Sequence, residues 1–242
     1  MKFNTIWFAL LVAAALLLTS CKKDDNTVTP PPTTTHASGT YTGMIAGGSE
    51  SGVLTLNIPT SSALPKTMRD ATVITVSGTL NVGGTPITLS GTYDTSNDSL
   101  HVSGGGYSFI GTYSNGVLVG SYTGPHGSGG FSTQSSSGTD TVKVYLGSSQ
   151  SQVSGHSSST LNIVVKGNKL LGLAVNGSDK TPFAGTISGD AIKLTASFEG
   201  LSAVLGGGTF NAGHTSASGT YDTSPWNSSN ADHGTWSVQL AH

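Results

Sequence analysis

The stretch ATVITVSGTLNV, at residues 71–82, decides the fold class. Ile74, Val76 and Leu80 alternate with hydroxyl and amide side chains, so one face of this segment is apolar and the other is polar. An alternation with a period of two is typical of a β-strand that is buried on one side only. The segment therefore predicts a half-buried strand, and the same pattern recurs on both sides of it.

Segments with this alternation follow one another closely and predict an all-β protein. In the first half we expect about eight strands, at residues 39–46, 51–58, 71–82, 85–93, 98–103, 106–114, 116–123 and 128–134. The second half contains about as many, including the run in which Ile192, Leu194 and Ala196 alternate with other residues. Asn115-Gly116 predicts a two-residue hairpin, because both central residues of a type I′ turn take positive φ.

Composition excludes several classes of protein. The 242 residues include 34 Gly, only 9% are charged, and the formal net charge is -2. Glycine weakens helices, so a helical protein is not expected. Nucleic acid is not an expected partner, since its binding requires clustered Lys and Arg. A hydrophobic content of 35% argues against a chain that is disordered throughout.

Two short matches indicate an internal duplication. TLNI at residues 55–58 recurs at residues 160–163, and FSTQ at residues 131–134 is matched by WSVQ at residues 236–239. Both pairs are displaced by 105 residues, and two matches with one offset are hard to obtain by accident. The chain therefore contains two homologous units in tandem.

The duplication predicts units at residues 39–135 and 140–242. The seven-residue sequence SGTYDTS occurs at residues 90–96 and 218–224, with a different offset. We therefore interpret it as a short sequence that recurs where a strand leads into a turn, and not as the same position in each unit. Eight sequential antiparallel strands can close into an up-and-down barrel, and closure removes exposed strand edges. Two tandem barrels are the preferred architecture. Two β-sandwiches, or one sheet shared by both units, are the alternatives.

The opening Gly39-Thr40-Tyr41 resembles the Gly-x-Trp of the first strand in lipocalin-like proteins of the calycin group, with Tyr in place of Trp. This resemblance implies a barrel that carries a small apolar ligand. A cavity of roughly 300 Å³ or more, lined by Val, Leu and Phe, would favour such a carrier. A filled interior would favour binding at the surface instead.

The first twenty residues have the organisation of a secretory signal peptide. Lys2 precedes an apolar run from Ile6 to Leu18, which is too short to span a bilayer as a helix. The sequence Leu-Thr-Ser-Cys at residues 18–21 resembles the lipobox of bacterial lipoproteins. It implies that residues 1–20 are removed and that Cys21, the only cysteine, carries palmitate or related acyl chains. Two or three such chains anchor a protein durably to a membrane.

The residues after Cys21 favour an outer-membrane location. Lys-Lys-Asp-Asp at residues 22–25 resembles the tract that follows the lipidated cysteine in surface-exported lipoproteins of Bacteroidota. This resemblance implies a position on the cell surface, and a periplasmic orientation is the alternative. Residues 21–38 contain consecutive prolines and threonines, which predict an extended, semi-rigid linker.

No residue pattern points to catalysis or to a metal. None of the seven histidines has the spacing of a metal site, so neither a metal nor a cofactor is expected. Asp94, Asp98, Asp222 and Asp232 fall in expected turns, where carboxylates cap backbone N–H groups. Calcium binding at residues 94–98 is the alternative. No catalytic residue is assigned, although the paired carboxylates of a glycan hydrolase need no fixed spacing along the chain.

The last hairpin of the second unit carries the one candidate binding site. It is about six residues longer than its counterpart and contains Trp226, Asn227, Asn230 and Asp232. An indole in a polar loop can stack on a sugar ring or press on a partner, while amides and a carboxylate supply hydrogen bonds. The alternative is that Trp226 folds back over an open barrel end.

Together these patterns predict a non-catalytic binding or adhesion module, anchored to the outer membrane through Cys21. Its ligand would be a glycan or a protein. A lipocalin-like carrier of a small apolar ligand is the first alternative, and a glycan hydrolase is the second. No oligomeric state is predicted.

Overall fold

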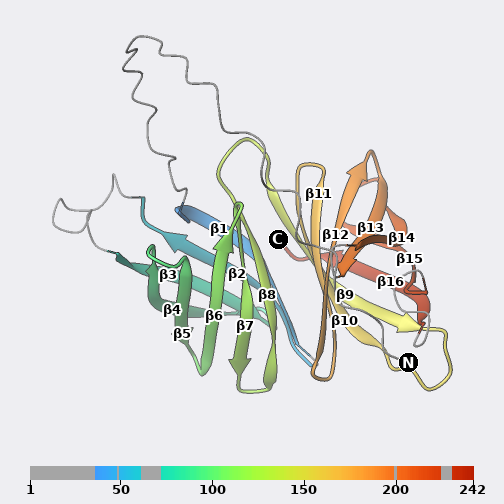
Figure 1. Cartoon of the computed structure of the whole chain (residues 1–242), viewed down its shortest axis with the longest axis horizontal. Helices are drawn as coiled ribbons and strands as arrows, with labels where there is room; N and C mark the ends of the chain where they lie inside the picture. Colours follow the sequence, from blue (N-terminus) through green and yellow to red (C-terminus); the bar gives the residue numbers. More distant parts are fainter. Residues whose placement is uncertain (1–35, 48, 61–71, 199–200, 225–230) are drawn as a thin grey trace, which may run out of the picture. The chain divides into compact units, whose positions relative to one another are not determined.

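A computed structural model describes residues 36–47, 49–60, 72–198, 201–224 and 231–242 of the chain. These residues form two closed antiparallel β-barrels of eight strands each, one after the other in the sequence (Figure 1). The predicted all-β fold with two barrels is confirmed. The sandwich and shared-sheet alternatives are wrong, because each sheet closes on itself.

The described residues form strands and turns and contain no helix. They therefore contain no helix that could cross a membrane. The predicted signal peptide at residues 1–20, the lipidation site Cys21 and most of the linker, up to residue 35, lie outside the described residues.

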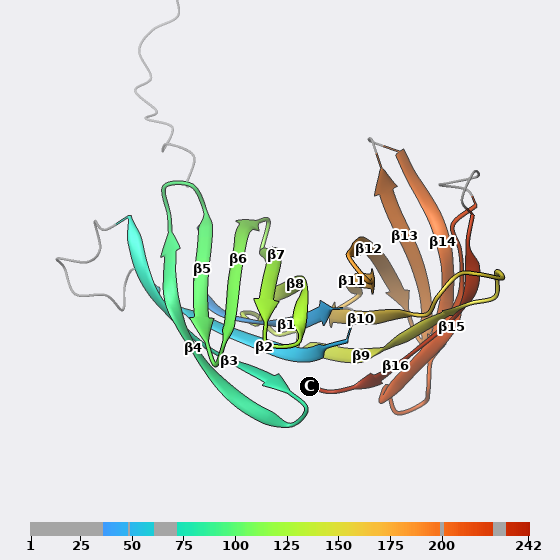
Figure 2. The same cartoon turned by 90° about the horizontal axis from the view of Figure 1, so that it is seen from below.

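The first barrel is an up-and-down meander, and Figure 2 shows β3 to β7 following one another along its wall. β1 pairs with both β2 and β8, which closes the barrel. Its strands are β1 (Gly39–Gly47), β2 (Ser51–Ile58), β3 (Val73–Val82), β4 (Thr85–Asp94), β5 (Ser99–Gly104), β6 (Tyr107–Ser114), β7 (Val117–Gly124) and β8 (Gly127–Ser135).

The second barrel has the same topology. β9 pairs with both β10 and β16 and closes the sheet. Its strands are β9 (Val142–Ser151), β10 (Ser159–Lys166), β11 (Lys169–Asn176), β12 (Asp179–Ser188), β13 (Ala191–Phe198), β14 (Leu201–Phe210), β15 (Ser216–Asp222) and β16 (His233–Leu240).

The repeats occupy equivalent strands of the two barrels. TLNI lies in β2 and β10, the second strand of each barrel, while FSTQ and WSVQ lie in β8 and β16, the last strands. The SGTYDTS heptad begins in β4 and in β15, which are the fourth and the seventh strand. The two heptads are therefore not equivalent, as their offset predicted.

The predicted hairpin between β6 and β7 is confirmed. Asn115 and Gly116 have φ angles of 51° and 85°, as a type I′ turn requires. Glycine is also needed inside the wall, where Gly111 pairs with Gly120 beneath the ring of Phe131. A Cβ at Gly111 would lie 2.5 Å from that ring, so a larger residue would displace it.

Side chains of alternating strand residues fill the interior of the first barrel. Phe109 is fully buried, and its ring centroid lies 5.7 Å from that of Phe131 and 5.8 Å from that of Tyr122. Such aromatic pairs stabilise a core beyond the burial of their area. The buried core cluster comprises Ala37, Tyr41, Ile45, Leu54, Leu56, Ile58, Val76, Leu80, Leu89, Tyr93, Leu100, Val102, Tyr107, Phe109, Leu118, Tyr122 and Phe131.

The second barrel has a separate core. Trp236, at the position equivalent to Phe131, is 3% exposed and belongs to this core. The cluster comprises Tyr145, Leu161, Ile163, Val165, Leu170, Phe183, Ile192, Leu194, Ala196, Leu205, Phe210, Ala217, Trp236 and Val238.

A third apolar cluster joins outward-facing residues of the two barrels. This inter-barrel cluster comprises Met44, Ala46, Val142, Val144, Val164, Leu173 and Val175. Beside it Asn162 is fully buried, and its Nδ2 donates to the carbonyl of Ile45 at 2.7 Å and to the hydroxyl of Ser51 at 3.0 Å. The side-chain oxygen of Asn162 accepts from the N–H of Gly147 at 3.0 Å. The polar atoms of this buried amide are thereby satisfied.

Candidate functional site

Of the four residues proposed for binding, Asp232 lies within the described part of the chain. It immediately precedes β16, while Trp226, Asn227 and Asn230 fall in residues 225–230, outside the described residues. The hairpin that contains them is longer than its counterpart, as predicted. Tyr122 pairs with Gly129, seven positions later, whereas Tyr221 pairs with Gly234, thirteen positions later.

Hydrogen bonds between Thr223 and Asp232 clamp the base of this hairpin. The N–H of Thr223 donates to the carbonyl of Asp232 at 2.8 Å, and the N–H of Asp232 donates to the hydroxyl of Thr223 at 2.8 Å. The same hydroxyl donates to the carbonyl of Asp232 at 3.1 Å. The two chain segments that carry residues 225–230 are therefore held together at the barrel end.

The carboxylate of Asp232 is the centre of a polar cluster at this end of the second barrel. It accepts hydrogen bonds from the hydroxyls of Ser151 at 2.5 Å and Tyr221 at 3.0 Å. Nδ1 of His156 lies 3.5 Å from the same carboxylate, whose side chain is 26% exposed. Burial and the hydrogen bond to Asp232 raise the pKa of Tyr221 to about 12, so this phenol stays protonated and donates at neutral pH.

The geometry of the Asp232 cluster favours positioning over catalysis. Among the described residues the hydroxyl of Ser151 donates to the carboxylate and has no hydrogen bond with His156, so the three side chains do not form the relay in which a histidine activates a serine. The carboxylate oxygens are occupied by Ser151 and Tyr221. These two bonds orient the carboxylate, and its exposed part can still accept a hydrogen bond from a ligand, while the backbone of Asp232 holds the loop base.

The first barrel has a related cluster at the corresponding end, which the sequence did not reveal. Tyr122 is the counterpart of Tyr221, and it lies near Glu50, which is only 6% exposed. The hydroxyl of Tyr107 donates to Glu50 at 2.8 Å. Burial, more than the neighbouring carboxylate, raises the pKa of Tyr122. No local sequence pattern signalled this cluster, because Glu50 and Tyr107 are 57 residues apart and meet only in the closed barrel.

Histidine–aspartate pairs occur at the ends of both barrels. The pairs are His36 with Asp98 at 3.0 Å, His156 with Asp232 at 3.5 Å and His214 with Asp190 at 2.7 Å. Each consists of one histidine and one aspartate. Among the residues that the structure describes, no three His, Cys, Asp or Glu side chains gather where they could hold a metal ion.

The aspartates at the end of β4 make turn contacts. Asp94 accepts from the N–H and hydroxyl of Ser96, and these two bonds lower the pKa of its carboxyl. Burial acts to raise the pKa of Asp98, but hydrogen bonds from Tyr93 and His36 outweigh it and lower the pKa. Asp94 and Asp222 cap backbone N–H groups as predicted, whereas Asp98 accepts hydrogen bonds from the side chains of Tyr93 and His36 instead.

Comparisons with known proteins do not assign the chain to a family. No protein-family model matches the chain, and no curated protein sequence matches it. Among solved structures, the chain is similar to a tryptophan-to-alanine mutant of the vaccine antigen transferrin binding protein B from Haemophilus parasuis Hp5. The identity is 12% and the TM-score is 0.32. The similarity covers 68% of this chain and 40% of the other, so this chain spans less than half of that protein.

Proposed function

We propose that this chain is an outer-membrane lipoprotein whose two barrels form a non-catalytic binding module at the cell surface. Cys21 provides the lipid anchor, and residues 22–38 separate the barrels from the membrane. The signal-like residues 1–20 and the lipobox-like sequence before Cys21 support the anchor. The packed cores support binding at the barrel ends or on the outer surface, since aromatic and aliphatic side chains occupy the middle of both interiors.

The proposed contact surface is the long hairpin of the second barrel, with Trp226 as its centre. Asn227 and Asn230 supply hydrogen bonds, and Asp232 holds the base of the loop. The observation that carries this proposal is the clamp between Thr223 and Asp232, because a fixed loop base lowers the entropy lost on binding. The proposed ligand is a surface glycan or a protein.

We expect Trp226→Ala to abolish binding of the ligand while leaving the melting temperature nearly unchanged. In the proposed role the indole contacts the ligand and not a core, so its removal deletes the stacking surface without opening a core cavity. The measurement is binding of the full chain to a glycan array, together with a thermal melt. Trp226→Phe, which keeps an aromatic face, should retain part of the binding. A large fall in melting temperature with Trp226→Ala would instead assign the indole to a barrel core.

We expect Cys21→Ser to release the protein from membranes. Without the thiol no acyl chain can be attached, so the proposed lipid anchor is lost. Fractionation of cells that express the full chain would measure this change. Ser20→Ala, which keeps a small residue before the cysteine, serves as the matched control and should remain in the membrane fraction. Unchanged fractionation of Cys21→Ser would refute lipidation.

A further inference from the structure

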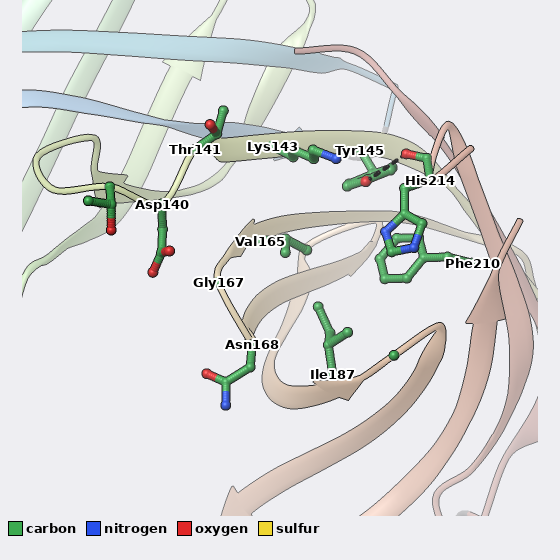
Figure 3. A pocket seen from close by; sticks show the side chains of 12 residues that line it. Asp140, Thr141, Lys143, Tyr145, Val165, Gly167, Asn168, Ile187, Phe210 and His214 are labelled. Carbon is green, nitrogen blue, oxygen red and sulfur yellow. Dashed lines mark hydrogen bonds between the residues drawn. The ribbon is translucent and has the colours of Figure 1, made fainter. Parts of the chain in front are cut away.

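A pocket of about 450 Å³ opens at the end of the second barrel opposite to the Asp232 cluster. Its lining includes inward-facing side chains of four strands, and Figure 3 shows Lys143, Val165, Ile187 and Phe210 around it. Asp140 and Asn168 add polar groups from the connections beside the strands (Figure 3). The volume lies within the range of small-molecule sites.

The equivalent mouth of the first barrel is closed. Pairing with the second strand aligns Ala37 with Lys143, whereas pairing with the last strand aligns Tyr41 with Tyr145 and therefore Gly39 with Lys143. In either register the inward residues before Tyr41 lie at the mouth that Lys143 occupies in the second barrel. Ala37 is 2% exposed and belongs to the core, and its N–H donates to the hydroxyl of Tyr93 at 3.0 Å. The duplicated barrels thus differ at this end, where one has a plug and the other a pocket.

The fourth strand of each barrel shows the same difference. Its last inward side chain is Tyr93 in the first barrel and the shorter Ile187 in the second. The Tyr93 hydroxyl reaches the N–H of Ala37 and also bonds Asp98, which closes the mouth. Ile187 makes no such bridge and instead forms part of the pocket wall.

Two charged groups at the pocket are free to contact a ligand. Within the described part of the chain, neither the ammonium of Lys143 nor the carboxylate of Asp140 has a hydrogen bond or an ion pair. Lys143 faces inward beside Val165, its cross-strand partner. By contrast, His214 is fixed, since its ring stacks on Phe210 at 4.8 Å and Nε2 lies 2.7 Å from Asp190.

The lining does not favour a ligand of either net charge. Asp140 and Lys143 carry opposite charges, so an anion or a cation is attracted by one of them and repelled by the other. A purely apolar ligand would cover both charged groups without satisfying them. A neutral ligand with one apolar face and several hydroxyl groups meets none of these penalties. Its hydroxyls can donate to Asp140 and accept from Lys143, while its apolar face rests on Val165 and Ile187.

We propose that the open mouth of the second barrel binds a neutral sugar unit, with Asp140 and Lys143 hydrogen-bonding its hydroxyl groups. The site is separate from the Trp226 loop, which begins at the other end of the same barrel. It therefore provides the chain with a second contact for a glycan and does not depend on the first.

The test is calorimetric titration of the full chain, in a polyoxyethylene detergent that contains no sugar. The probes are the neutral sugars glucose, galactose, mannose and N-acetylglucosamine, with glucuronate and glucosamine as charged comparisons. We expect at least one neutral sugar to bind with a Kd on the order of 1 mM. Asp140→Ala and Lys143→Ala should each weaken its binding about ten-fold. Absence of binding by every neutral sugar, or tighter binding of a charged one, would overturn the proposal.

Two control variants separate this site from the rest of the molecule. Asp179→Ala removes an exposed carboxylate at the turn between β11 and β12, at the opposite end of the barrel, and should leave sugar binding unchanged. Trp226→Ala should also leave it unchanged, so failure of the proposed loop and failure of this pocket are distinguishable. If Asp140→Ala and Lys143→Ala bind sugar as the parent does, the pocket is not the site.

Discussion

Replacing Phe109 by Ala should lower the free energy of unfolding by about 3–5 kcal/mol. The ring is fully buried and contacts the aromatic cluster of Tyr107, Tyr122 and Phe131, with ring centroids 5.7 to 6.4 Å away. Truncation leaves a cavity that the closed wall of the barrel cannot fill by collapse. Urea denaturation of parent and variant, followed by circular dichroism, measures the difference.

Ile110→Ala is the matched control for this change. Ile110 is the next residue along β6, but it faces outward and is 55% exposed. Its truncation should change the free energy of unfolding by less than about 0.5 kcal/mol. Equal losses for Phe109→Ala and Ile110→Ala would contradict the alternation of buried and exposed residues along β6.

Asn162→Ala should lower the free energy of unfolding by about 3 kcal/mol. The variant leaves the carbonyl of Ile45 and the N–H of Gly147 without their partner, at a site where Asn162 is fully buried. Each unpaired buried group costs about 1–3 kcal/mol. Denaturation curves recorded with a probe in each barrel would show whether their unfolding also becomes less coupled.

The duplication supplies the control for Asn162. Asn57 occupies the same position of the TLNI repeat, in β2, but it is exposed. Asn57→Ala should leave stability within about 0.5 kcal/mol of the parent. If both asparagines prove equally dispensable, the hydrogen bonds of Asn162 do not stabilise the contact between the barrels.

The strands could be predicted from sequence because burial in a barrel wall is one-sided. The pattern at residues 71–82 has an apolar residue at every second position, and β3 indeed spans Val73–Val82 within it. Tight turns such as Asn115-Gly116 predict that each strand pairs with the next strand in the sequence, because successive hairpins form a meander. Closure into barrels was an inference from strand number and edge protection, and the structure confirms it.

The contact between the barrels was not predicted, because it breaks the alternation. Outward residues of β1 such as Met44 and Ala46 are fully buried against the second barrel, so this strand is covered on both faces. The TLNI repeat gives no sign of this contact between the barrels. Asn57 and Asn162 are identical in sequence, and only their surroundings in space make the first exposed and the second buried.

The polar clusters at the barrel ends were also missed, for a related reason. Glu50 and Tyr107 are 57 residues apart and meet only because the strands curve around one barrel end. Similarly, the pocket of the second barrel depends on which side chains reach the mouth: Ala37 and Tyr93 are buried there in the first barrel, whereas Lys143 and Ile187 line an opening in the second. Contacts of this kind depend on closure of the sheet and not on local spacing.

The most direct test of the proposed binding module is an array that presents both glycans and apolar lipids to the full chain. Packed interiors and polar barrel ends predict saturable binding to a glycan and no retention of apolar lipid. Extraction of a stoichiometric apolar molecule from the purified protein, with no glycan bound on the array, would contradict a surface-binding module and favour a carrier.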